Sequence, residues 1–168
     1  MKESLLAFCC FLIFAAVAAY ADTPAQNVSV SKHPNLAKAQ YLVNLAYLKV
    51  GDAQKANEYD LGGHADKARS YLQEANDHLK QAALSANQNA DGNKENVTRY
   101  EDIPEPNVSE NKHPNIAKAQ SYIEGAYTSV VAAQKANEYD LGGHAEKAKT
   151  LLEQAQKELK LAAQAANK

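Results

Sequence analysis

The sequence predicts an all-α protein in which two tandem αα-hairpins form a four-helix bundle. The 168-residue chain repeats itself without a gap at an offset of 80, so that residues 27–87 match residues 107–167 at 37 of 61 positions. Each copy carries two Ala-rich segments whose apolar residues recur with helical spacing. A Gly-Gly pair separates the two segments, and this pattern is typical of a helical hairpin.

The N-terminal residues 1–21 have the pattern of a secretory signal peptide. Lys2 supplies a positive charge, residues 5–19 are apolar without interruption, and residues 19–21 read Ala-Tyr-Ala, a cleavage pattern. The apolar run is shorter than the roughly 20 residues that a membrane-spanning helix needs. We therefore expect cleavage after Ala21 and a mature protein that is periplasmic or secreted, without a membrane span.

The composition of the mature chain excludes several kinds of site. Both cysteines, Cys9 and Cys10, lie in the apolar run, so cleavage removes the means to form disulfides, zinc–thiolate sites or cysteine nucleophiles. The formal charge stays at −2 because Lys2 and Glu3 cancel. A chain with this charge has no basic footprint for nucleic acid, and we expect no nucleic-acid partner.

The first helix of each repeat is expected at residues 34–59 and 114–139. Both segments begin with His-Pro, and proline suits the first helical position because its missing amide would have no partner there. Apolar residues then follow a 3,4,3,4,3 spacing, which forms one narrow stripe that requires a partner helix. The stripe residues are Leu36, Ala39, Val43, Ala46, Val50 and Ala53, and in the copy Ile116, Ala119, Ile123, Ala126, Val130 and Ala133.

The second helix of each repeat is expected at residues 64–87 and 144–167. Small alanines alternate with leucines along its stripe, which lets two helices approach closely. The stripe residues are Ala65, Ala68, Leu72, Ala75, Leu79, Ala82 and Ala86, and in the copy Ala145, Ala148, Leu152, Ala155, Leu159, Ala162 and Ala166. Two such hairpins bury their stripes by packing into a four-helix bundle.

The predicted organisation after the signal peptide has four parts. An N-terminal extension covers 22–32, the first hairpin repeat 33–87, a polar linker 88–112 and the second hairpin repeat 113–168. At about 3.3 Å per residue the linker can stretch roughly 80 Å, the length of the bundle and more. The sequence therefore leaves open whether the hairpins lie parallel or antiparallel.

The hairpin tips are the most strictly repeated part of the chain. Residues 53–65, AQKANEYDLGGHA, equal residues 133–145 at all 13 positions, whereas the other 48 aligned positions match at 24. Turn structure alone explains much of this, because glycine accepts a left-handed C-cap conformation and Asn or Asp can bond free backbone groups at a helix end. This account covers Asn57, Asp60, Leu61, Gly62 and Gly63, but it does not require His64.

A second interpretation of the tips is metal binding. His64 and His144 stand at the start of their helices, where the positive end of the helix dipole disfavours an imidazolium and keeps the ring neutral. A neutral imidazole binds metals, and Asp60 and Asp140 lie close enough in sequence to add oxygen ligands. A His and carboxylate set suits divalent transition metals.

His33 and His113 also repeat, one helix length away from the tip of their own hairpin. In a parallel packing His64 meets His144 and His33 meets His113; in an antiparallel packing His33 meets His144 and His64 meets His113. The alternative for His33 and His113 is helix entry beside proline. Either packing places two histidines at each end of the bundle.

The remaining patterns point away from other sites. His78 has no repeat counterpart, because Glu158 stands in its place, and we expect it to be exposed. The chain contains no phosphate-binding glycine loop and no His-x-x-x-His or Glu-x-x-His pair. We therefore expect that it is not an enzyme.

Three stretches together resemble the small metal-binding protein family of bacterial periplasmic helical bundles. They are HPN-[LI]-AKAQ at 33–40 and 113–120, the tip AQKANEYDLGGHA, and the trailing L-K-x-A-A-x-x-A-N. The resemblance implies an exported bundle that binds divalent ions such as copper, nickel or zinc through histidines. On this chain only His33, His64, His113 and His144 match, whereas the metal-binding type is His-rich along its helices.

The sequence therefore predicts an exported protein that binds copper, nickel or zinc through histidines at helix ends. The alternative is a helical interaction or envelope-stress module without a ligand. The first function requires histidine-dependent metal uptake, and the second requires a stable protein partner, whose identity the sequence does not indicate.

Overall fold

The computed structural model describes residues 23–58, 61–88, 107–138 and 141–167. These residues form four helices and no strand, which confirms the all-α four-helix bundle. The helices are α2 (Pro34–Ala56), α3 (His64–Ala86), α4 (Pro114–Ala136) and α5 (His144–Ala165). Each begins where the sequence predicted.

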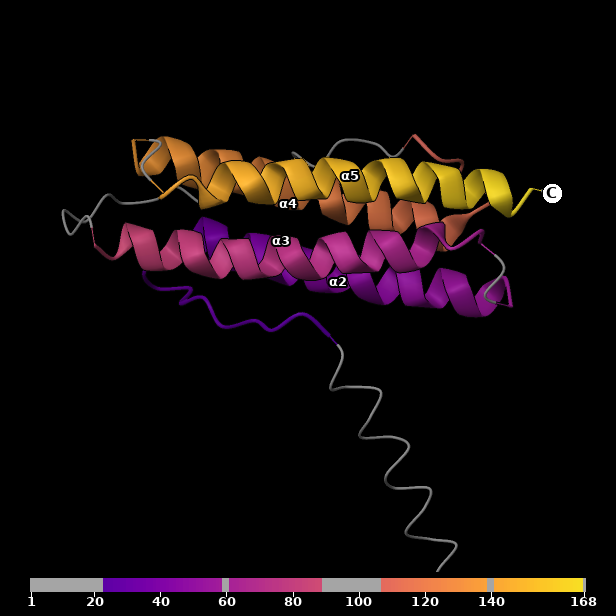
Figure 1. Ribbon diagram of the computed structural model, residues 1–168, viewed down its shortest axis with the longest axis horizontal. Helices are drawn as coiled ribbons and strands as arrows, with labels where there is room; N and C mark the ends of the chain where they lie inside the picture. The colour runs from indigo at the N-terminus through magenta and orange to yellow at the C-terminus, as the bar shows by residue number, and fades with distance from the viewer. Residues whose placement is uncertain (1–22, 59–60, 89–106, 139–140, 168) are drawn as a thin grey trace, which may run out of the picture.

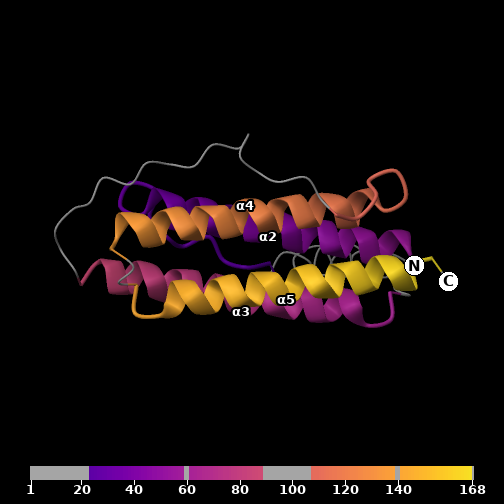
Figure 2. The same cartoon turned by 90° about the horizontal axis from the view of Figure 1, so that it is seen from above.

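The two hairpins pack antiparallel to each other, which decides between the two packings that the sequence allowed. The four helices lie side by side along one axis, and the chain direction of α4 is opposite to that of α2 (Figures 1 and 2). Contacts between hairpins, α2 with α4 and α3 with α5, are more extensive than those within each hairpin. Every neighbouring pair of helices is antiparallel, and the end of α2 therefore lies beside the start of α4.

The predicted stripes form the core. Of the stripe residues, all but Ala166 are buried, and Ala166 is partly buried against the same cluster. The alanine positions allow the close approach of helices that the stripe spacing indicates, and leucine or isoleucine side chains fill the layers between them. The apolar periodicity is thus the main determinant of the bundle.

Segments that precede each hairpin are tied to it by one buried glutamine. Gln40 Oε1 accepts hydrogen bonds from the backbone N–H groups of Asn27 and Val28, both at 2.9 Å. In the second repeat Gln120 Oε1 accepts from the N–H of Val108 at 3.0 Å. Each glutamine is almost completely buried, and these bonds satisfy its polar atoms inside the core.

The helices end slightly earlier than predicted. The first helices end at residues 56 and 136 rather than 59 and 139, and the second at 86 and 165 rather than 87 and 167. The cause at the tips is a left-handed residue directly after the C-cap, Glu58 (φ 49°) and its copy Glu138 (φ 50°). A left-handed residue at this position ends an α-helix.

The tips are turns in which Asn57 and Leu61 have the roles that the sequence predicted. The glycines, however, do not supply the left-handed residue that ends the first helix of the hairpin. Asn57 Nδ2 donates to the carbonyl of Ala53 at 2.8 Å, and Leu61 is buried. Gly62 and Gly63 also have positive φ, but they lie just before α3 instead of capping α2. Glutamate, which tolerates this conformation less well than glycine, occupies the left-handed position that ends α2.

Several predictions concern residues outside the described part of the chain. These are the signal peptide at 1–21 with its cleavage site, the metal ligands Asp60 and Asp140, and linker residues 89–106. Within the described ranges, no helix combines the length and hydropathy needed to cross a membrane.

Candidate functional site

Antiparallel packing gives the four repeated histidines partners other than one another. His33 and His144 lie at one end of the bundle, and His64 and His113 at the other, as expected for this packing. Their side chains bond to different residues, however. The hydrogen bonds are His33 to Asn87, His64 to Glu158, His113 to Asn167 and His144 to His78.

The two-histidine pair lies between α3 and α5. The Nδ1 atoms of His78 and His144 are 3.0 Å apart, and the ring centroids are 5.2 Å apart with an interplanar angle of 31°. Only one of the two facing nitrogens can carry a proton, because the other must accept it. The contact therefore excludes the state in which both rings are positively charged imidazolium, because both Nδ1 atoms would then carry a proton.

The equivalent contact at the other end joins a histidine to a carboxylate. His64 Nδ1 lies 2.7 Å from Glu158 Oε2, and both side chains are largely buried. Glu158 occupies the position of His78 in the second repeat, 80 residues later. The bundle thus holds two versions of one contact between α3 and α5, related by the internal repeat, with a histidine in one where the other has a glutamate.

The prediction that His78 is simply exposed is wrong. His78 is only partly exposed and forms the contact with His144. It lies 14 residues after His64, about four helical turns, and therefore on the same face of α3. The spacing of 14 residues could have placed His78 and His64 on one face of α3. Which residue His78 contacts, however, depends on the antiparallel register between α3 and α5.

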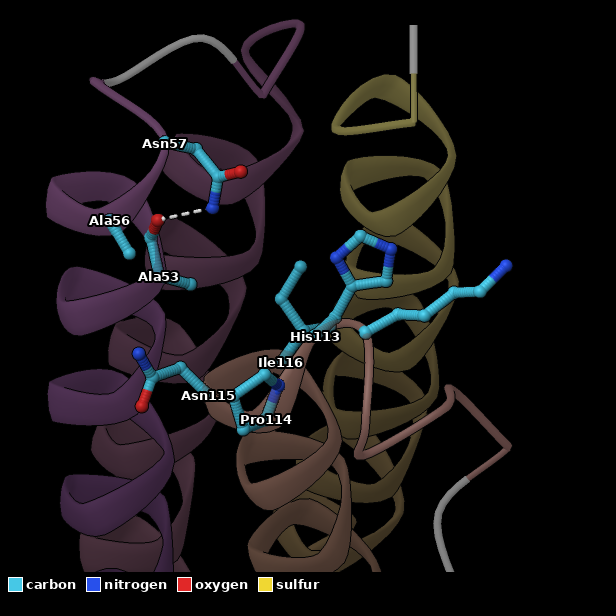
Figure 3. A pocket seen from close by; sticks show the side chains of 8 residues that line it. Ala53, Ala56, Asn57, His113, Pro114, Asn115 and Ile116 are labelled. Carbon is cyan, nitrogen blue, oxygen red and sulfur yellow. Dashed lines mark hydrogen bonds between the residues drawn. The ribbon is translucent and has the colours of Figure 1, made fainter.

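His33 and His113 contact asparagine side chains instead of another histidine or a carboxylate. His33 Nε2 lies 3.1 Å from Asn87 Oδ1, so its bond ties the start of α2 to the end of α3. His113 lines a pocket of about 160 Å³ between the end of α2 and the start of α4, where Asn57 is held by its bond to Ala53 (Figure 3). Among the described residues that line this pocket there is no carboxylate, and Lys112 adds a positive charge to it.

Electrostatics favour a neutral ring at His144. Burial lowers the pKa of His144 below its usual value, and the charges of His78 and Lys147 lower this pKa further. The free ring nitrogen of a neutral imidazole can donate an electron pair to a metal. Among the described residues, however, no group of three or more His, Cys, Asp or Glu side chains is arranged to hold a metal ion.

We expect the lowered pKa of His144 to make the fold sensitive to acid. Unfolded histidine titrates near pH 6.5, so protonation favours the unfolded chain when the folded pKa is lower. The stability contributed by His144 is therefore fully present above about pH 6.5 and is lost as the pH falls through the lower folded pKa. Urea unfolding at about pH 7.5 and about pH 5.5, on either side of the usual histidine pKa, measures the change.

His144→Gln should lose less stability over this pH interval than the wild type. His64→Gln is the matched control, because His64 occupies the equivalent position but faces a carboxylate. An equal acid sensitivity in wild type and His144→Gln would contradict the prediction.

Comparisons of the chain with protein-family models, with curated proteins and with solved structures find no match.

Proposed function

We propose that this chain is an exported helical protein that binds a divalent transition metal ion through His78 and His144. The observation that supports the proposal is the 3.0 Å separation of their Nδ1 atoms. Two nitrogens bound to one ion at about 2.0–2.1 Å lie roughly 2.8–3.4 Å apart when the ligand angle is between about 90° and 110°. The two nitrogens are therefore already at a separation that a shared ion requires, and the rings need only turn so that both lone pairs point at the ion.

The donor set determines the kind of ion. Two imidazole nitrogens suit copper, nickel and zinc, and they do not suit magnesium or calcium, which prefer oxygen ligands. Each ring would hold its remaining proton on Nε2, and water would complete the coordination. With two protein ligands we expect weak to moderate affinity and about one ion per chain.

The revised site differs from the one predicted by sequence. His144 stays as a ligand, His78 joins it, and His64 becomes a secondary candidate because Glu158 already accepts its hydrogen bond. His33 and His113 are bonded to asparagines and are not assigned as ligands. The resemblance to the small metal-binding protein family implies both export and metal binding. The proposal assigns no catalytic reaction.

Metal titration of the mature protein tests the site directly. Copper, nickel and zinc would each be titrated at neutral pH by calorimetry, with a competing chelator to define the affinity. We expect saturable binding of one ion that falls at least about tenfold in His78→Gln and in His144→Gln, because either change removes one of two ligands. Binding should also weaken below about pH 6.5, where imidazole protonation competes with the metal.

The control is the double variant His33→Ala/His113→Ala, which removes the two histidines that lie outside the proposed site. It should bind as the wild type does. Absence of saturable binding in the wild type, or unchanged binding in both single variants, would refute the proposal.

The ligand-free alternative has one observation in its favour. Each repeated histidine already has a hydrogen-bond partner on another helix or at a helix end, so the histidines can act as structural links. In that case the histidine variants would lose stability without any metal-dependent difference, and a protein partner would carry the function.

A further inference from the structure

The outer face of α2 carries a row of large apolar side chains that reach solvent. Tyr41 is 41% exposed and Leu48 is 45% exposed, although both lie in the middle of the helix. Leu45 lies between them and is partly buried against the core cluster. Spacings of four and three residues place the three side chains on one side of the helix. A row of this kind on the surface of a folded chain is typical of an interaction site.

Charge is distributed unevenly over the two layers of the bundle. Helices α2 and α4 form one layer, and α3 and α5 form the other (Figure 2). The charged residues of the α2–α4 layer are Lys38, Lys49, Asp52 and Lys55, and in α4 Lys118, Glu124 and Lys135. Helices α3 and α5, which have nearly the same lengths, carry six and seven charged residues. The outer face of the α2–α4 layer is therefore the one that loses its contact with water at the lower cost.

Helix α4 has small residues at the repeat positions where α2 has this row. They are Ser121, Gly125 and Thr128. Ser121 Oγ and Thr128 Oγ1 each donate to the carbonyl four residues earlier in α4, at 3.3 Å and 2.9 Å. Because both hydroxyl protons already have an acceptor in their own helix, another surface can cover this row without leaving an unsatisfied donor.

The bulky row of α2 and the small row of α4 run in opposite directions along the same face. The end of α2 lies beside the start of α4, where residues of both helices line one pocket. Both helices rise by the same distance per residue, so counting from that end places Tyr41 level with Thr128. The same count places Leu48 level with Ser121. Each exposed bulky residue of α2 therefore has a small residue of α4 at its own height.

We propose that the outer face of α2 and α4 binds a second copy of this chain, related by a two-fold axis parallel to the helices. Such an axis places α4 of one copy over α2 of the other without changing its height. Tyr41 and Leu48 of each copy then pack over the small row of the other. A two-fold axis perpendicular to the helices would instead place bulky row on bulky row and small row on small row. The parallel axis is thus the one that gives close packing.

Charge and area both fit a second copy. Asp52 follows Leu48 by one helical turn, and Lys118 of α4 is level with Asp52. The parallel axis brings Asp52 of one copy to Lys118 of the other, and the carboxylate that accepts from Lys49 at 2.7 Å has a second oxygen for this contact. Two helices about 34 Å long and about 10 Å wide offer roughly 700 Å² per copy, close to the roughly 800 Å² of a stable interface. The pair of His78 and His144 lies in the other layer, so this inference does not depend on the proposed function.

Sedimentation velocity of the mature protein over a range of concentrations tests the inference. We expect a species of twice the monomer mass to form as the concentration rises through the micromolar range. Tyr41→Lys/Leu48→Lys should raise the dissociation constant at least about 100-fold, because it places four like charges in the interface. Both positions are exposed in the single chain, so the variant should stay folded, and circular dichroism would verify this.

Leu84→Lys/Leu161→Lys is the matched control. These leucines of α3 and α5 are 48% and 40% exposed, as Tyr41 and Leu48 are, but they lie in the other layer. The control should leave the dissociation constant within about twofold. A protein that stays monomeric over the whole concentration range, or a dimer that the lysine variant of α2 does not weaken, would overturn the inference.

A second variant separates complementary packing from general apolar association. Ser121→Leu/Thr128→Leu makes both rows bulky and adds apolar surface. If the bulky row packs over the small row, this change should weaken the dimer at least about tenfold, because the larger side chains overfill the interface. A tighter dimer would show that apolar area alone drives association, and the proposed packing would then be wrong.

Discussion

Leu72→Asp should unfold the first hairpin and with it most of the bundle. Leu72 is fully buried in the stripe of α3, at a layer that contacts neighbouring helices. The substitution leaves a cavity and places a carboxylate where no partner is available, which together cost at least about 4 kcal/mol. Because domains of this size are stable by roughly 5–15 kcal/mol, we expect either loss of the folded state or a fall in Tm of about 15 °C.

Circular dichroism at 222 nm during a thermal melt measures this effect. The neighbouring Gln73→Asp introduces the same carboxylate at an exposed position of α3 and should change Tm by no more than a few degrees. A Leu72→Asp protein that melts with the wild type would show that the stripe is not the core.

The sequence predicted the helices and their buried faces because both depend on local periodicity. A residue such as Leu79 or Ile123 is buried through its place in a 3,4,3,4 pattern, and that pattern is visible without tertiary information. The polar residues of the core had no such signal. Gln40 is buried because it binds the backbone of a segment that precedes the helix, and only the folded chain brings the two together.

The contact between His78 and His144 could not be predicted from the sequence, because it depends on the register between the two hairpins. His144 contacts His78 only because α5 runs antiparallel to α3 with one particular alignment. The linker is long enough for either direction, so no local pattern fixed this alignment. The left-handed conformation of Glu58 was missed for a different reason, since the adjacent glycine pair is the usual candidate for positive φ.

Glu158→His should convert the second version of the site into a copy of the first and raise the metal stoichiometry from about one ion per chain to about two. Glu158 is the repeat counterpart of His78, and it already lies 2.7 Å from His64 Nδ1. A histidine at this position can adopt the arrangement seen for His78 and His144, in which two Nδ1 atoms face each other between α3 and α5. Two imidazoles bind copper, nickel or zinc better than a hydrogen-bonded imidazole and carboxylate.

Calorimetric titration of Glu158→His gives the stoichiometry, and the reciprocal variant His78→Glu is its matched control. His78→Glu places a carboxylate opposite His144, as Glu158 lies opposite His64, and should therefore abolish the one site of the wild type. Combining both changes should move the site to the other end of the bundle and restore a stoichiometry of about one. If Glu158→His binds no more metal than the wild type, while remaining folded, a facing pair of histidines between α3 and α5 is not by itself sufficient to bind metal, and the prediction of a second site is wrong.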